Sequence, residues 1–154
     1  MKLRDHIPAT GLLPRMACRD KEEVVTSLVT ALGPTGGITE TGELVADILR
    51  QEERGQTAIG RGLAVPHIRT LKVNTFQIAV GTLERPLNIP AADDQPVDVF
   101  VLILCPSRDA RQLLLVLARL ARMVKQDQFL DDLRRAETPQ GMRDIITACE
   151  AKLI

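Results

Sequence analysis

Aromatic residues are almost absent from this sequence, which has three Phe, no Trp and no Tyr. A core must therefore be built from aliphatic side chains. Stacking of bases on aromatic rings, on which single-stranded nucleic-acid binding depends, is not available on any scale. Net charge is also absent, because 20 Lys and Arg residues balance 20 Asp and Glu residues. No overall field then draws the chain to nucleic acid or to an acidic membrane surface, and we expect no nucleic-acid partner.

Cysteine and long apolar runs are scarce as well. Cys18, Cys105 and Cys149 are odd in number and have no Cys-x-x-Cys spacing, which excludes a disulfide framework or a zinc site and predicts reduced thiols. The longest apolar run, residues 99–105, is too short to span a bilayer. The N-terminus lacks the continuous apolar segment of a signal peptide. We therefore expect a cytoplasmic protein with no membrane insertion.

The chain has 154 residues, of which 45% are hydrophobic and 26% are charged. This length is typical of one domain and is enough to bury a substantial core. The composition is that of a globular protein and not of a disordered one. We therefore expect residues 1–154 to form a single domain.

Periodicity and turn residues predict both helices and strands. Asp20 is placed as the N-cap of a helix that the glycines and proline of residues 33–37 should end, and a second amphipathic helix should begin near residues 39–41. Segments 76–83 and 97–104 are rich in β-formers, and the second is continuously apolar from residue 99, as in a strand buried on both faces. Three further helices are predicted: a leucine-rich one after residues 106–109, capped by Ser107 or Asp109, a short one over 129–135, and a last one over 138–152.

These elements predict an α/β fold. We expect a mixed sheet of about four to five strands sandwiched between helices on both faces. In such a fold the segment 57–70, TAIGRGLAVPHIRT, would bring His67 to the end of a strand, in a cleft.

His67 is one of only two histidines and directly follows a glycine-spaced apolar run and a proline. Neutral imidazole is a nucleophile near physiological pH, so His67 is the candidate reactive residue. Phosphoryl transfer requires mainly positioning and electrostatic stabilisation. A histidine in a turn rich in hydrogen-bond donors therefore suits the acceptance of a phosphoryl group without a metal.

Four neighbours of His67 have the chemistry to bind phosphate. Gly60 and Gly62 have no Cβ, so backbone N–H groups there can approach an anion closely. Thr57 offers a hydroxyl donor and Arg69 a permanent positive charge. These four residues predict a phosphate-binding site around His67.

Other interpretations of the same residues remain open. On spacing alone, the favoured interpretation of His67 is a histidine that ends a strand and hydrogen-bonds within a loop. Nucleotide-binding motifs do not fit, because the third glycine of the dinucleotide fingerprint and the Lys-Ser or Lys-Thr of a P-loop are missing. A metal-dependent hydrolase is disfavoured because His6 and His67 are distant in sequence. We expect no metal and no cofactor.

The run GQTAIGRGLAVPHIRT resembles the signature G-S-T-x-I-G-x-G-x-A-x-P-H of the EIIA domains of the bacterial phosphoenolpyruvate-dependent phosphotransferase system, in the fructose, mannitol and nitrogen-regulatory class. The similarity continues through ERPLNIPAADDQPVDVFVLILCPS and LLLVLARLARMVKQDQFLDDLRRAETPQGM, so it covers nearly the whole chain. In that family the signature histidine accepts the phosphoryl group, which implies that His67 does so here.

The resemblance also implies a function and its partners. The chain would be a stoichiometric phosphohistidine carrier that receives phosphate from a histidine phosphocarrier protein. It would pass the phosphate to a cysteine of an EIIB domain, or hold it as a mark that controls binding to a regulated target protein. A transport role and a nitrogen-regulatory role are both compatible with the resemblance.

Two positions depart from the family pattern. The family's usual arginine falls on Gln51, and the second histidine falls on Ala110 when the sequences are aligned on LARL. Arg50 and Arg111 lie next to these positions and are candidates to supply the missing charge, although Arg50, like Arg54, is equally well explained as a surface arginine. The departures favour an alternative hypothesis, a phosphorylation-silent module that binds proteins through the EIIA fold, whereas the preserved His67 argues for phosphorylation.

Two further charged pairs receive structural interpretations. Asp93 and Asp94 lie in a proline-rich turn, where adjacent carboxylates are usually turn formers. Arg134 and Arg135 are interpreted as a solvated face, the alternative being a docking surface.

Overall fold

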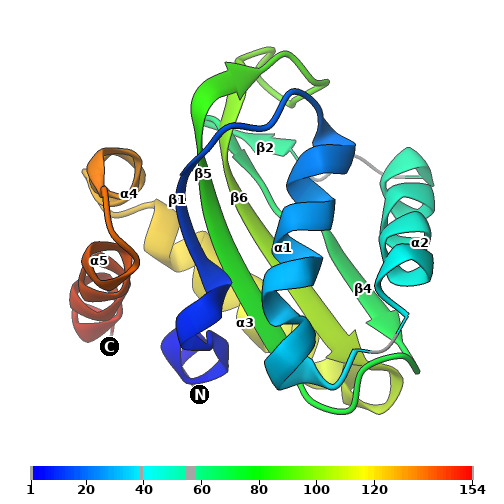
Figure 1. Cartoon of the computed structure of the whole chain (residues 1–154). Coiled ribbons are helices and arrows are strands. Elements are labelled where there is room, and N and C mark those ends of the chain that lie inside the picture. Colours follow the sequence, from blue (N-terminus) through cyan, green and yellow to red (C-terminus); the bar gives the residue numbers. More distant parts are fainter. Residues whose placement is uncertain (1, 39, 55–57, 154) are drawn as a thin grey trace.

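A mixed six-stranded sheet passes through the molecule with helices on both faces (Figure 1). The computed structural model describes residues 2–38, 40–54 and 58–153. The sheet order is β1-β5-β6-β3-β2, and β4 also pairs with β6. β5 is antiparallel to β6 and β2 to β3, while the other pairs are parallel. The strands are β1 (Leu12–Met16), β2 (Ala58–Gly60), β3 (Leu63–Ala64), β4 (His67–Thr70), β5 (Gln77–Leu87) and β6 (Val97–Pro106).

The helices form two layers. α1 (Lys21–Gly36) and α2 (Thr41–Arg54) cover one face, and α3 (Ala110–Val124), α4 (Phe129–Arg135) and α5 (Pro139–Ala151) contribute to the core of the other. Short 3-10 turns lie at Leu3–His6, Ala9–Gly11 and Ser107–Asp109. The predicted α/β sandwich is confirmed. The sheet has more strands than expected because residues 58–70 form three short ones.

β6 explains why one segment of the sequence is apolar without interruption. Its side chains alternate between two separate cores, as a strand requires. Val101, Ile103 and Cys105 pack with α3, α4 and α5, whereas Leu102 and Leu104 pack with α1 and α2. The predicted burial on both faces is therefore confirmed.

α1 begins as predicted and ends later than predicted. The Asp20 carboxylate accepts a hydrogen bond from the backbone N–H of Glu23 at 2.9 Å, which satisfies one free donor of the first turn. The helix then continues through Pro34 to Gly36. A proline in the last turn removes a single helical hydrogen bond, and Gly37, with φ of 65°, closes the helix by donating its N–H to the carbonyl of Gly33.

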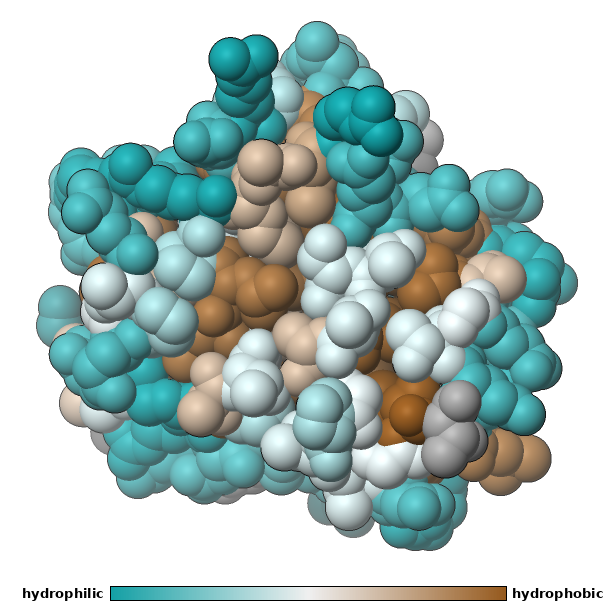
Figure 2. All heavy atoms as spheres, in the orientation of Figure 1, coloured by the Kyte–Doolittle hydropathy of each residue, from teal (hydrophilic) through white to brown (hydrophobic). Residues whose placement is uncertain are grey.

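The C-terminal helices agree closely with the sequence. α4 spans the predicted residues, and the Thr138 hydroxyl caps α5 by accepting the N–H of Gly141 at 3.0 Å. Within the described ranges, no helix is both long and apolar enough to cross a membrane. On the face that carries α1 and α2, hydrophobic side chains emerge in separate patches between hydrophilic ones (Figure 2).

Candidate functional site

β3 and β4 lie along β6 in one continuous register. Leu63 pairs with Val99, and His67, the first residue of β4, pairs with Ile103. Because side chains alternate along an extended chain, His67 follows Leu63 and Val65 on the side of the sheet that faces α3. Both of these residues lie in the core beneath that helix.

His67 opens onto a pocket of about 440 Å³ at the edge of the sheet. β4 contributes His67, Ile68 and Arg69 to its lining. The remaining described lining residues come from elements on either side: Gln51 from α2, Ser107 from the 3-10 turn before α3, and Leu113 from α3. The pocket therefore lies where β4, α2 and the beginning of α3 meet.

Among the described residues, one backbone group holds the imidazole of His67. Its Nδ1 lies 2.7 Å from the carbonyl oxygen of Val65. A carbonyl oxygen can only accept a hydrogen bond, so the neutral ring carries its proton on Nδ1 and donates it there. Nε2 then keeps its lone pair, which makes it the nucleophilic nitrogen.

The polar groups of the pocket suit an anion. Arg69 is exposed and is the only permanently charged side chain among the described residues that line the pocket. Gln51 and Ser107 add an amide and a hydroxyl, both hydrogen-bond donors. Ser107 was predicted as a possible helix cap, but Asp109 is the residue at the cap of α3 and its side chain makes no capping bond.

Gly60 and Gly62 lie away from the pocket, in the tight turn between β2 and β3. Gly62 precedes His67 by five residues, which at about 3.3 Å per residue of strand separates them by roughly 16 Å. Neither glycine lines the pocket. The two glycines are therefore not brought together with His67, and their role must be found at the turn itself.

At this turn the missing Cβ atoms make room for charged side chains. A Cβ on Gly60 would lie 3.2 Å from Asp93 Oδ2, the atom that accepts the N–H of Arg61 at 2.8 Å. This hydrogen bond is the main cause that lowers the pKa of the Asp93 carboxyl below its ordinary value. A Cβ on Gly62 would lie 2.8 Å from Asp98 Oδ1 and would overlap the guanidinium of Arg134. The space that the two glycines leave is therefore occupied by the side chains of Asp93, Asp98 and Arg134.

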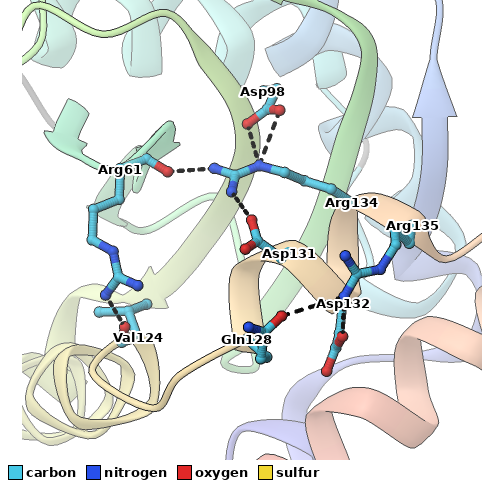
Figure 3. Close-up of polar contacts among 8 residues, drawn as sticks. All are labelled: Arg61, Asp98, Val124, Gln128, Asp131, Asp132, Arg134 and Arg135. Carbon is cyan, nitrogen blue, oxygen red and sulfur yellow. Dashed lines mark hydrogen bonds and ion pairs between the residues drawn. The ribbon is translucent and has the colours of Figure 1, made fainter.

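Arg134 clamps this turn to α4 and β6 (Figure 3). Its Nε donates to both oxygens of Asp98 at 2.9 and 3.0 Å, one Nη donates to Asp131, and the other to the carbonyl of Arg61. The side chain of Arg61 in turn reaches the carbonyl of Val124, at the end of α3. The interpretation of Arg134 as a solvated residue is therefore wrong. No sequence pattern predicted Asp98 as its partner. The adjacent Arg135 pairs within α4, with Asp132, and is largely exposed.

Removal of the clamp should destabilise the protein. We expect Arg134→Ala to lower the free energy of unfolding by about 1–3 kcal/mol, because it leaves the largely buried carboxylate of Asp98 unpaired. Arg135→Ala is the matched control and should change it by less than about 0.5 kcal/mol, because an exposed ion pair contributes little. Urea unfolding followed by circular dichroism measures both. Equal losses for the two variants would contradict the clamp.

The remaining predicted residues are dispersed. Arg50 lies on α2 and pairs with Asp47, and neither it nor Arg111, which is exposed on α3, lines the pocket. Thr57 lies outside the described residues. Gln51 does line the pocket, as its alignment with the family's arginine predicts, but on α3 the lining residue is Leu113 and not Ala110. The correction follows from position along the helix and from side-chain length, because residues three apart lie on nearly the same side of a helix but about 4.5 Å apart along its axis, and leucine reaches further than alanine.

Comparison with known proteins agrees with this architecture. Residues 12–149 match the family model described as "Phosphoenolpyruvate-dependent sugar phosphotransferase system, EIIA 2". A nitrogen regulatory protein of Bradyrhizobium diazoefficiens is 28% identical over 147 residues, 95% of each chain. The crystal structure of nitrogen regulatory protein IIA-Ntr from Neisseria meningitidis superposes with a TM-score of 0.85 at 22% identity, over 93% of this chain and 97% of that one.

A further structural neighbour is the mannitol enzyme IIA of Escherichia coli, solved in complex with phosphorylated enzyme IIB. It has a TM-score of 0.75 at 16% identity and covers 92% of this chain and 96% of that one. The mixed sheet between helices is thus a fold that this chain shares with solved IIA proteins. The chain belongs to the EIIA 2 family of the phosphoenolpyruvate-dependent sugar phosphotransferase system.

Proposed function

We propose that the chain accepts a phosphoryl group on Nε2 of His67 from a histidine-phosphorylated carrier protein. It then passes the group to the cysteine of an EIIB-type protein, or holds it to control binding to a target protein, in the cytoplasm. The observation that carries the proposal is the hydrogen bond from His67 Nδ1 to the Val65 carbonyl. This bond leaves the lone pair of Nε2 available to attack phosphorus.

The chemistry follows from these few groups. The Nε2 lone pair attacks the phosphorus of the donor's phosphohistidine and forms the new N–P bond. The donor's N–P bond breaks, and its electron pair returns to the donor imidazole. Arg69 lies on the same strand and offers its charge to the transferred phosphoryl oxygens, while the Val65 carbonyl, bonded to Nδ1–H, favours the positive charge that develops on the ring. In the forward step, a cysteine thiolate attacks phosphorus and the N–P electron pair returns to Nε2.

Gln51 and Leu113 support the alternative of a phosphorylation-silent binding module. A glutamine amide and a leucine in the pocket leave Arg69 to carry the electrostatic part of phosphate binding among the described residues. Uptake of phosphate by the chain therefore distinguishes the carrier from the binding module.

The deciding experiment is the intact mass of the protein after incubation with phosphoenolpyruvate, the first enzyme of the system and its histidine carrier, taken from the organism that encodes the chain. We expect a gain of one phosphate that is lost in acid and stable in base, as a phosphohistidine is. A known EIIA protein serves as the positive control. No gain while the control is phosphorylated would overturn the proposal and favour the binding module.

A further inference from the structure

A row of polar side chains lies along one side of α2. Glu43, Asp47 and Gln51 are spaced four residues apart, which places them one above the other on a helix. Gln51, the last of the three, lines the His67 pocket. The other two pair with the same lysine. One side of α2 therefore carries both a pocket residue and an ion-pair site.

The lysine is Lys72, which lies just beyond the end of β4, the strand beside α2 (Figure 1). Its Nζ is 2.6 Å from Asp47 Oδ2 and 3.2 Å from Glu43 Oε1. Its backbone N–H donates to the hydroxyl of Thr70, the last residue of β4, at 3.1 Å. Thr70 is buried, and every residue of β4 is paired with β6. Lys72 therefore joins α2 to the strand that begins with His67.

The Lys72–Asp47 pair is partly shielded from solvent. The two side chains are 26% and 17% exposed, whereas that of Glu43 is 58% exposed. Salt screens a partly buried pair less than an exposed one, so Asp47 is the principal partner. The hydrogen bond to Asp47, followed by that to Glu43, raises the pKa of Lys72 above the ordinary value of a lysine. The ammonium group therefore stays charged at neutral pH.

Other contacts hold α2 in different directions. Lys21, the first residue of α1, lies 3.6 Å from the buried carboxylate of Glu52 and joins α2 to α1. The inner side of α2 packs in the core through Leu44, Val45 and Ile48. Apolar contact is non-directional and does not by itself fix a helix along its own axis. The ion pair with Lys72 supplies a directional contact between α2 and the end of β4.

We propose that Lys72 is a positioning residue for phosphoryl transfer, which holds the Gln51 amide opposite His67 by fixing α2 against β4. Asp47 and Gln51 are one turn apart, about 6 Å along the helix axis, so a shift of one moves the other equally. The amide can donate to a phosphoryl oxygen on Nε2 of His67, and a misplacement of about 1 Å weakens such an interaction strongly. The inference rests on the proposed function and assigns it a residue that lies outside the pocket lining.

A double-mutant cycle tests this mode of action. The rate of transfer from the phosphorylated histidine carrier to the chain is measured by rapid quench. Lys72→Met should lower this rate by about three- to tenfold, and Gln51→Ala by at least as much. Because Lys72 acts through Gln51, Lys72→Met should have no further effect in a Gln51→Ala background. Lys72→Arg keeps the charge and should retain most of the wild-type rate.

Arg19→Met is the matched control for Lys72→Met. It removes an equal charge and another ion pair, with Glu23 of α1, and neither residue lines the pocket. This variant should transfer at the wild-type rate, and circular dichroism verifies that every variant is folded. The proposal is overturned if Lys72→Met does not slow transfer, if it slows transfer equally in both backgrounds, or if Gln51→Ala transfers as the wild type does.

A measurement without phosphate separates this inference from the proposed function. In the nuclear magnetic resonance spectrum of the isotope-labelled, unphosphorylated protein, the side-chain amide signals of Gln51 are those absent from Gln51→Ala. They should shift in Lys72→Met and stay in place in Arg19→Met. If they shift but the chain takes up no phosphate, the link from Lys72 to Gln51 stands and the transfer function fails. If phosphate is taken up but the signals do not shift, the transfer function stands and the positioning role fails.

Discussion

Replacement of His67 by glutamine is expected to abolish phosphate uptake while leaving the protein folded. Glutamine has a similar reach but no nucleophilic nitrogen, so the gain in mass seen with the wild type should disappear completely. The fold should tolerate the change, because His67 is only half-buried and its ring makes one hydrogen bond within the described part of the chain, to the Val65 carbonyl. Loss of one such bond lowers the free energy of unfolding by about 1 kcal/mol.

The other histidine of the chain supplies the control. His6 packs edge-on against Phe76, with ring centroids 5.2 Å apart, and does not line the His67 pocket. His6→Gln should therefore take up phosphate as the wild type does. Uptake by His67→Gln, or its loss in His6→Gln, would show that His67 is not the acceptor.

Substitution of Gly62 by alanine is expected to be among the most destabilising single changes in the chain. Gly62 has a φ of 80°, a left-handed conformation that costs an alanine about 1–2 kcal/mol. The new methyl group would also lie 2.8 Å from Asp98 Oδ1 and overlap the Arg134 guanidinium, so the clamp would have to open. Together these effects should lower the free energy of unfolding by about 2–5 kcal/mol.

Gly42 is the matched control for this change. It lies in the first turn of α2, and a Cβ added there meets nothing within 4 Å. Gly42→Ala should leave stability unchanged or raise it by up to about 1 kcal/mol, because alanine is the better helix former. Both variants are measured by urea unfolding. A Gly62→Ala protein as stable as the Gly42→Ala protein would mean that the turn yields without opening the clamp.

The fold was predictable where local pattern and tertiary packing agree. β6 is apolar from Val99 to Cys105 because both of its faces are buried there, and the caps at Asp20 and Thr138 are local hydrogen bonds that the sequence alone specifies. The continuation of α1 through Pro34 was not predictable by the same means. A proline breaks a helix by default, and only the closure of the last turn by Gly37 shows that this one is tolerated.

The site was only partly predictable because the residues that line it come from elements that are distant in sequence. Gln51 could be placed from its spacing within the signature, whereas Ser107 and Leu113 reach the pocket through the arrangement of β6 and α3. Gly60 and Gly62 were predicted to bind phosphate because a residue without a Cβ allows close approach of any neighbouring group. Its neighbours here, Asp93, Asp98 and Arg134, are distant in sequence, and no local signal identifies them.

Because β3 and β4 pair with β6 in one continuous register, the number of residues from Leu63 to His67 decides which face of the sheet the imidazole lies on. Leu63 and His67 pair with Val99 and Ile103 with no shift between them. A strand turns successive side chains to opposite faces, so one residue added or removed between the clamped turn and His67 would direct the imidazole into the core beneath α1 and α2. Two residues would restore its direction but displace it by about 7 Å along β6, away from Gln51 and Ser107. The length of this segment is thereby constrained as strictly as the identity of the histidine.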